Sequence, residues 1–136
     1  MRDLMNAALD EADRLGASRN NAVAMGYCFG GAAVLELARS GADLKGFATF
    51  HGGLKTPDGQ DYSKTRGEVL IMHGSADSAI TMDQFAGLTN ELEAAGVMHQ
   101  MVTYSGAPYA FTVFGSDRYR KDADTKSWRL FGEFLT

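Results

Sequence analysis

The sequence predicts an α/β fold in which a parallel sheet of about four strands is flanked by helices. Short apolar runs of strand length alternate with segments whose apolar residues recur at helical spacing, a pattern typical of parallel sheets. The chain has 136 residues, of which 45% are hydrophobic and 22% charged, so we expect a single domain over residues 1–136. No linker, internal repeat or low-complexity segment interrupts it.

The first two elements follow from the spacing of apolar residues. Residues 22–27 contain a short, continuous apolar run, which predicts a strand buried on both faces. Ahead of it, apolar residues at helical spacing predict a helix that ends at Gly16. These residues are Leu4, Ala8, Ala12 and Leu15.

A second helix, a strand and a loop come next. Val34, Leu37 and Ala38 recur at helical spacing, and Gly41 is suited to end that helix. Residues 46–50 (GFATF) predict the second strand, which two glycines stop. Residues 54–66 are polar and include a Pro-Asp-Gly turn, so we expect a surface loop there.

The remaining elements continue the alternation. Residues 68–72 (EVLIM) and 100–104 predict the third and fourth strands. Between them, Thr81 and Gln84 form a capping box for a helix that Gly96 ends. Its predicted apolar face consists of Phe85, Leu88, Leu92 and Ala95.

The last helix is predicted over residues 122–135, with Trp128, Phe131 and Leu135 facing inward. Strands taken in chain order with right-handed crossovers place the crossover helices on one face of the sheet. The opposite face is then left mainly to this last helix, which also carries Phe134.

The run MGYCFGGAAVLELA, residues 25–38, is the most informative stretch of the chain. It places Cys28 where an apolar strand turns sharply into a helix, and such a turn needs strained backbone and small neighbours. Gly26, Gly30 and Gly31 provide the space. The helix N-terminus favours the thiolate form of a cysteine at this position. The pattern indicates a nucleophile elbow with cysteine in place of serine.

This run has two other interpretations. Cys28 could be a small buried hydrophobic residue beside a plain glycine turn, as many free cysteines are. A dinucleotide-binding G-x-G-x-x-G motif does not fit, because its second glycine would fall where Cys28 stands. The agreement of strand, glycine spacing and helix favours the elbow.

Composition and charge exclude several classes of protein. The net charge of -4 and the scattered distribution of the 13 basic residues argue against a nucleic-acid partner. The single cysteine excludes an internal disulfide framework and is typical of a reducing cytoplasm. No apolar stretch has membrane-spanning length, and the N-terminal residues lack the build of a signal peptide. We therefore expect a cytoplasmic protein without a membrane partner.

The chain resembles the dienelactone hydrolase family of α/β-hydrolases, over the C-terminal part of that fold. The resemblance implies a truncated α/β-hydrolase fold, with about 100 family residues ahead of this segment. It also implies Cys28 as nucleophile, Asp77 as the aspartate of a triad, and hydrolysis of small esters or enol-lactones without a metal or organic cofactor. The segments that carry it are GYCFGG (26–31), HGSAD (73–77), YSGAPYAFTVFGSDRY (104–119) and DADTKSWRLFGEFL (122–135).

One position departs from the family pattern. Tyr109 stands where the family has its triad histidine. Tyrosine, with a reference pKa of about 10, is protonated at neutral pH and is a poor base there. A thiolate can still attack, but thioester breakdown then lacks a group that activates water. The resemblance also places one oxyanion donor in the preceding residues and the other at the amide of Phe29, so we expect impaired turnover.

Three histidines are alternative bases. His51 and His73 follow the strands predicted at 46–50 and 68–72, at the edge of the sheet where parallel α/β folds carry function. Neither occupies the family's histidine loop, and a histidine-glycine pair at a strand end more often shapes the turn. His73 therefore ranks above His51 as a base, and both rank low. His99 precedes the last strand, at the opposite end of the sheet, and is expected on the surface.

Other polar residues have simpler interpretations beside functional ones. Asp77 could cap its own loop instead of serving a triad. Arg118 and Tyr119 lie in a loop that the resemblance places near the pocket, and exposed polar residues are the ordinary alternative. Asp122 and Asp124 are explained as acidic residues at a helix N-terminus.

Two function classes stay open from the sequence. One is a cysteine hydrolase for small esters or lactones, and the other is a catalytically inactive remnant that serves as a binding or scaffold module. A redox role has only Cys28 behind it, with no resolving cysteine. Without the family's preceding strands, residues 22–25 form an exposed apolar edge, so we expect a homodimer or higher oligomer that buries this edge or the uncovered sheet face.

Overall fold

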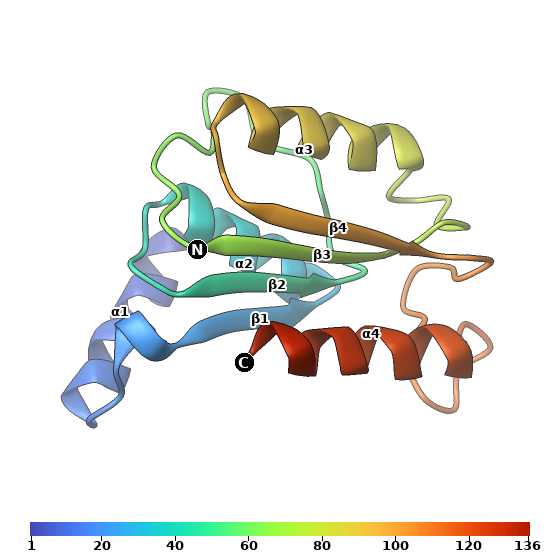
Figure 1. Ribbon diagram of the computed structural model, residues 1–136, viewed down its shortest axis with the longest axis horizontal. Coiled ribbons are helices and arrows are strands. Elements are labelled where there is room, and N and C mark those ends of the chain that lie inside the picture. The colour runs from blue at the N-terminus through green and yellow to red at the C-terminus, as the bar shows by residue number, and fades with distance from the viewer.

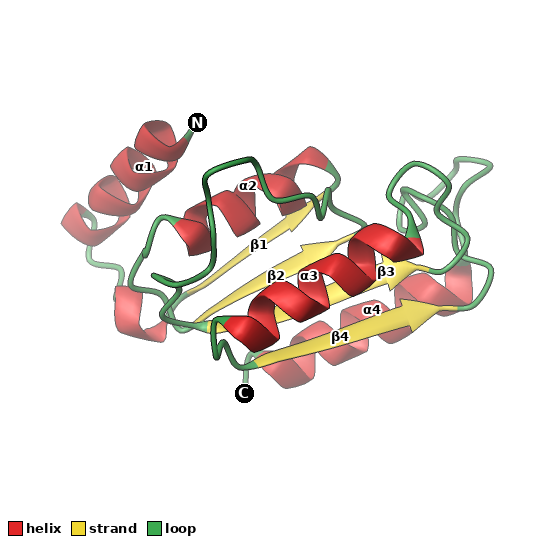
Figure 2. Cartoon of the chain, turned by 90° about the horizontal axis from the view of Figure 1, so that it is seen from above, coloured by secondary structure: helices red, strands yellow, loops and turns green.

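A computed structural model describes residues 1–136, and its centre is a sheet of four parallel strands. The strands lie side by side in chain order, and their arrows point the same way in Figure 2. Residues opposite one another include Tyr27 and Phe50 on the first two strands and His73 and Thr103 on the last two. The strands are β1 (Val23–Tyr27), β2 (Gly46–Phe50), β3 (Glu68–Gly74) and β4 (His99–Tyr104). The predicted parallel α/β sheet is confirmed.

Helices cover both faces of the sheet (Figures 1 and 2). Helices α2 and α3 pack over one face, α1 lies against α2, and α4 covers the opposite face. The bounds are α1 (Arg2–Arg14), α2 (Phe29–Arg39), α3 (Met82–Ala94) and α4 (Lys121–Phe134), with a short 3-10 turn, η1, at Arg19–Asn21. This division of the helices is the one that right-handed crossovers predict.

The ends of the helices show why they form where they do. The Thr81 hydroxyl accepts a hydrogen bond from the backbone N–H of Gln84 at 3.4 Å, so the predicted cap of α3 is present. Gly96 follows α3 with a φ of +67°, a left-handed conformation that glycine adopts without a steric cost. The observed element bounds lie within one or two residues of the predicted ones.

The last helix corrects the sequence-based expectation for individual side chains, and the first helix also exposes apolar residues that mark it in the sequence. In α1, Leu4 is 77% exposed and Leu15 is also exposed, whereas Met5 and Leu9 pack toward the core. In α4, Phe131 is buried but Trp128 is 57% exposed, and Leu135 is exposed as well. Each helix touches its neighbours along one narrow stripe, and residues at helical spacing beside that stripe stay in solvent.

The segment between β2 and β3 is the surface loop that its polar composition predicts, but two of its side chains are buried. Leu54 and Tyr62 from this segment are almost completely buried and belong to the core beneath α2 and α3. The expected turn is present, because the N–H of Gln60 donates to the carbonyl of Pro57 at 3.1 Å. The segment therefore closes one side of the hydrophobic core. No helix in the structure combines the length and the hydrophobicity needed to cross a membrane.

Candidate active site

Cys28 occupies a strained turn between β1 and α2. Its backbone has a φ of 53° and a ψ of -122°, and it is the N-cap of α2. A Cβ atom added at Gly26 would lie 2.3 Å from the carbonyl carbon of Gly30, so the turn requires glycine there. A Cβ atom added at Gly31 would lie 2.9 Å from the Cα of Gly52. The glycine spacing of the motif therefore follows from close backbone contacts.

The thiol of Cys28 is half-buried, and the next residue starts the helix. The N–H of Cys28 donates to the carbonyl of Phe50 at 3.1 Å, which ties the turn to β2. Phe29 is the first residue of α2, and the first amides of a helix have no partner within it. Its side chain is 73% exposed. The amide of Phe29 is thus the predicted oxyanion donor at the mouth of the turn.

His51 lies against the Cys28 thiol. Its Nδ1 atom is 3.4 Å from Sγ, and its Nε2 atom is 2.8 Å from the Thr112 hydroxyl oxygen. The side chain is completely buried, and this burial lowers the pKa of His51 to about 4, so the imidazole is neutral at neutral pH.

The sequence ranked His51 below His73 as a base, but it is His51 that the structure places against the thiol. Cys28 and His51 each directly follow one member of the aligned pair formed by Tyr27 and Phe50. Two side chains that follow paired residues on adjacent parallel strands emerge at the same edge of the sheet. Knowledge of the register between β1 and β2 would have predicted the contact between Cys28 and His51.

Tyr109 lies beside His51. Its ring stands edge-on to that of His51, with the centroids 5.8 Å apart. A hydrogen bond to Cys28 is the main cause that raises the pKa of Tyr109 to about 12, followed by burial and by the negative charges of Cys28 and Asp77. The positive charge of Arg118 acts in the opposite direction. Tyr109 is therefore a hydrogen-bond donor, and it is not a base at neutral pH.

Asp77 follows β3 and is buried. One carboxylate oxygen, Oδ1, accepts the N–H groups of Ala79 at 2.9 Å and Ile80 at 2.8 Å, which is the loop-capping role. The other oxygen, Oδ2, has no hydrogen-bond partner and lies 3.7 Å from the Nε2 atom of His73. Nε2 of His73 donates to the carbonyl of Ile80 at 2.8 Å, and its Nδ1 has no partner. His73, near the end of β3, is thus hydrogen-bonded to the loop that contains Asp77.

A small hollow adjoins Tyr109 and contains one positive charge. Its volume is about 160 Å³, and the guanidinium carbon of Arg118 lies 5.9 Å from the centre of the Tyr109 ring. The lining residues are Ser78, Ala79, Pro108, Tyr109 and Arg118.

The other polar candidates from the sequence make structural contacts. The Tyr119 hydroxyl donates to Asp124 at 3.0 Å, and Asp122 pairs with Lys126 at 2.8 Å within α4. His99 is 3.5 Å from Glu93 at the start of β4, the end of the sheet opposite Cys28.

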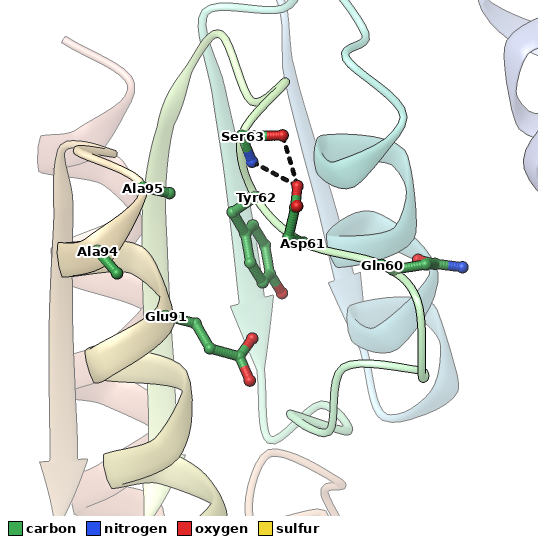
Figure 3. A pocket seen from close by; sticks show the side chains of 7 residues that line it. All are labelled: Gln60, Asp61, Tyr62, Ser63, Glu91, Ala94 and Ala95. Carbon is green, nitrogen blue, oxygen red and sulfur yellow. Dashed lines mark hydrogen bonds between the residues drawn. The ribbon is translucent and has the colours of Figure 1, made fainter.

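A larger hollow of about 420 Å³ lies between α3 and the segment before β3 (Figure 3). Its polar groups are paired with one another: Asp61 accepts hydrogen bonds from the backbone and hydroxyl of Ser63, and Glu91 accepts one from Thr56. It contains no nucleophile comparable to Cys28. Its lining consists of Gln60, Asp61, Tyr62, Ser63, Glu91, Ala94 and Ala95. No group of three or more His, Cys, Asp or Glu side chains is arranged to hold a metal ion.

The site geometry agrees with the result of a comparison with known families. The model of the dienelactone hydrolase family matches residues 1–136, the whole chain. The chain belongs to the dienelactone hydrolase family. Its sheet and helices are those of an α/β hydrolase, as the sequence predicted.

Solved structures of this fold are similar to the chain over most of its length. A dienelactone hydrolase-like promiscuous phosphotriesterase from metagenomic libraries is 32% identical, with a TM-score of 0.75 over 83% of this chain and 50% of its own. A structure named m3DLH is 31% identical, with a TM-score of 0.87 over 98% of this chain and 59% of its own.

A third structure, an α/β hydrolase enzyme from a Medee basin deep-sea metagenome library, shares the fold at 15% identity. Its TM-score is 0.79 over 98% of this chain and 61% of its own. The chain thus spans between 50% and 61% of the length of these three structures. No curated protein matches it significantly.

Proposed function

We propose that this chain of the dienelactone hydrolase family carries a thiol-dependent acyl-transfer site for small carboxylic esters or lactones. The observation that carries the proposal is Cys28 itself, half-exposed on a strained turn with its Sγ atom 3.4 Å from an imidazole nitrogen. Backbone strain of this kind persists only where the surrounding structure imposes it. The strained turn directs the Cys28 side chain away from the sheet.

The first half of the reaction uses groups that are present. Sγ of Cys28 forms a bond to the carbonyl carbon of the ester, and the carbonyl oxygen becomes an oxyanion beside the amide of Phe29. The bond to the leaving oxygen then breaks, that oxygen departs with a proton, and a thioester remains on Cys28. Tyr109 lies beside His51 at this site, and its hydroxyl stays protonated at neutral pH.

Tyr109 limits the second half of the reaction, the hydrolysis of the thioester. Hydrolysis of the thioester requires removal of a proton from the attacking water. A phenol whose pKa is raised to about 12 remains protonated at neutral pH and does not accept that proton. The proposed outcome is fast acylation of Cys28 followed by slow deacylation.

The same residue favours a second candidate function. If the acyl-enzyme does not form, the protonated Tyr109 and Cys28 are parts of a binding or scaffold module without turnover. The two functions differ in whether a covalent bond to Cys28 forms. The chain has one cysteine, so this question has a direct readout.

The test is pre-steady-state hydrolysis of p-nitrophenyl acetate at neutral pH. We expect a burst of about one nitrophenolate per chain, followed by a much slower rate, because acylation outruns deacylation. Intact-mass measurement should find one acetyl group, which peptide mapping assigns to Cys28. The Cys28→Ala variant should show neither burst nor acetylation, and His99→Gln, at the far end of the sheet, should behave as the wild type.

Two results would contradict the proposal in different ways. Absence of both burst and acetylation in the wild type supports the inactive binding module. Steady multiple turnover that Cys28→Ala abolishes shows that Tyr109 does not limit the reaction and that another group activates water.

A further inference from the structure

The Cys28 thiol lies against a side chain that has no role so far. The Nδ1 atom of the His51 imidazole is 3.4 Å from the Sγ atom. The opposite imidazole nitrogen is 2.8 Å from the hydroxyl oxygen of Thr112, which belongs to the loop after β4. A thiol, an imidazole and a hydroxyl thus form a chain of contacts that three separate segments supply.

We propose that His51 is the proton acceptor for Cys28 and that Thr112 is the positioning residue that turns Nδ1 of the imidazole toward the thiol. The catalytic meaning of this assignment rests on the proposed acyl-transfer function. The proton transfer itself does not, because it takes place within the pair of side chains.

The proposed step is balanced within the site and the ester substrate. The proton on Sγ moves to Nδ1 of His51 as the sulfur electron pair forms the bond to the carbonyl carbon. When the carbon–oxygen bond to the leaving group breaks, the Nδ1 proton goes to the leaving oxygen. His51 returns to its neutral form, and the acyl group stays on Cys28. No thiolate then remains beside the imidazole, and with a pKa of about 4 His51 is a weak base toward water, so deacylation stays slow.

The Thr112 hydroxyl can accept the proton of the tautomer that leaves Nδ1 free. When the N–H at Nε2 of His51 donates to the Thr112 hydroxyl, the proton of the neutral ring is at Nε2 and Nδ1 carries the lone pair. Nδ1 is the nitrogen that faces Cys28.

Backbone strain supports the assignment independently of these contacts. Three residues other than glycine have a positive φ: Cys28 at 53°, His51 at 40° and Ala110 at 63°. All three belong to this site, because Ala110 lies between Tyr109 and Thr112 on the loop that holds them. Positive φ costs free energy for residues with a Cβ atom, and such strain clusters at functional sites.

Burial keeps the imidazole unprotonated but also makes it a weaker base, so proton transfer to it depends on the direct contact with the thiol. His51 is completely buried, which lowers its pKa to about 4, so its lone pair is free throughout the neutral range. A thiolate in direct contact favours the protonated ring, so the proton can rest on Nδ1 while the sulfur reacts. The titratable groups that face His51 are Cys28, Tyr27 and Tyr109 in contact, and Asp77, His73 and Asp124 at longer range.

The test follows alkylation of Cys28 by iodoacetamide as a function of pH, which needs no ester substrate. A thiolate reacts and a thiol does not, so the rate for an isolated cysteine falls about tenfold for each pH unit below its pKa. In the wild type we expect the rate to level off below about pH 6, because transfer to His51 creates a thiolate without loss of a proton. It should fall again near pH 4, where His51 takes up a proton of its own.

Three variants make the test specific. In His51→Asn the rate should fall about tenfold per pH unit without levelling off, and asparagine tolerates the positive φ at this position. Thr112→Val, which keeps the side-chain shape, should lower the level portion about two- to tenfold, the effect of one hydrogen bond. His99→Gln removes a histidine far from the thiol and should leave the profile unchanged. Circular dichroism and thermal melting establish that each variant is folded.

The outcomes separate this inference from the proposed function. A wild-type profile that coincides with that of His51→Asn overturns the role of His51, even if the acetylation burst is present. A level portion that survives His51→Asn also overturns it, because another group then holds the proton. If the wild type levels off, His51→Asn does not, and no ester burst occurs, His51 accepts the thiol proton and the proposed hydrolase function fails.

Discussion

At the scale of single residues, the Asp77 carboxylate has an oxygen without a hydrogen-bond donor, and Tyr109 stands at the position from which a histidine would supply one. Oδ2 of Asp77 is buried and accepts no hydrogen bond, while Oδ1 already accepts two backbone N–H groups. A buried oxygen without a partner is costly unless a donor completes the site. A histidine in place of Tyr109 is the natural donor to Oδ2, because the negative charge of Asp77 already acts on residue 109.

The Tyr109→His substitution tests how much of the lost turnover lies in this one side chain. A positioned general base contributes about 10²–10⁴-fold, so full restoration would raise deacylation by that range. We expect a gain below about tenfold, because the oxyanion has one identified donor in this chain and the loss of a donor costs about 10²–10³-fold. Steady-state and burst kinetics with p-nitrophenyl acetate measure the change, with Tyr109→Phe as the matched control that removes only the hydroxyl. A gain above 10²-fold would show that the base alone was limiting.

The sequence predicted some residues of this site and missed others for a physical reason. Cys28 and Asp77 were predicted from local sequence: the glycine spacing around Cys28 and the family motif that contains Asp77. The contact between His51 and Cys28 depends on the register of β1 and β2, and the bond to Thr112 depends on the path of a distant loop. Local patterns do not contain that three-dimensional information.

At the scale of elements, a buried polar network joins α1, α2 and the segment before β3. Arg39 donates to Glu36 at 2.7 Å, to Gln60 at 2.8 Å and to the Tyr62 hydroxyl at 2.9 Å. Arg2 of α1 donates to the other oxygen of Glu36 at 2.9 Å. Burial acts to raise the pKa of Glu36, yet the hydrogen bonds from Arg39 and Arg2 outweigh it and hold that pKa below its ordinary value. The network attaches a polar segment to the core side chain Tyr62.

Removal of Arg39 should therefore destabilise the fold. The Arg39→Ala variant leaves one oxygen of the buried Glu36 carboxylate and the buried Tyr62 hydroxyl without their donor, which we expect to cost about 3 to 5 kcal/mol of unfolding free energy. The matched control is Arg66→Ala, because Arg66 and Asp43 are 3.9 Å apart and both exposed. That change should stay within about 0.5 kcal/mol. Urea unfolding monitored by circular dichroism measures both, and a loss below about 1 kcal/mol for Arg39→Ala would mean that water replaces the network.

Element positions were predictable, but the buried faces of the terminal helices were not. Strands β2 and β3 and helix α3 follow from apolar runs and caps that are local in sequence. The period of apolar residues defines a helix, but α1 and α4 each carry more apolar residues than one stripe holds. Which stripe packs is decided by neighbouring elements, so Leu4 and Trp128 are exposed although their spacing fits the pattern.

At the scale of the whole molecule, the sheet has two unpaired edges, and apolar side chains lie exposed beside one of them. Strand β1 pairs only with β2, and β4 pairs only with β3. Tyr27 at the end of β1 is stacked on Phe50 and is 38% exposed, and the exposed Trp128 of α4 lies 6.2 Å from the same Phe50 ring. An open strand edge next to exposed aromatic rings favours pairing with another chain.

We therefore propose a homodimer or higher oligomer that pairs through the β1 edge, and proline substitution at that edge tests it. The N–H of Cys28 and the carbonyl of Ala22 bond to β2, so by alternation the backbone groups of Val23 point away from the sheet. Val23→Pro removes an outward N–H without loss of a bond to β2, and the extended backbone of Ala22, with a φ of -119° and a ψ of 148°, suits the residue before a proline. Light scattering at micromolar concentration should show an oligomer for the wild type and a shift toward monomer for Val23→Pro. His99→Pro, at the first residue of the β4 edge, is the matched control and should leave the oligomer intact; a wild type that is a uniform monomer refutes the proposed assembly.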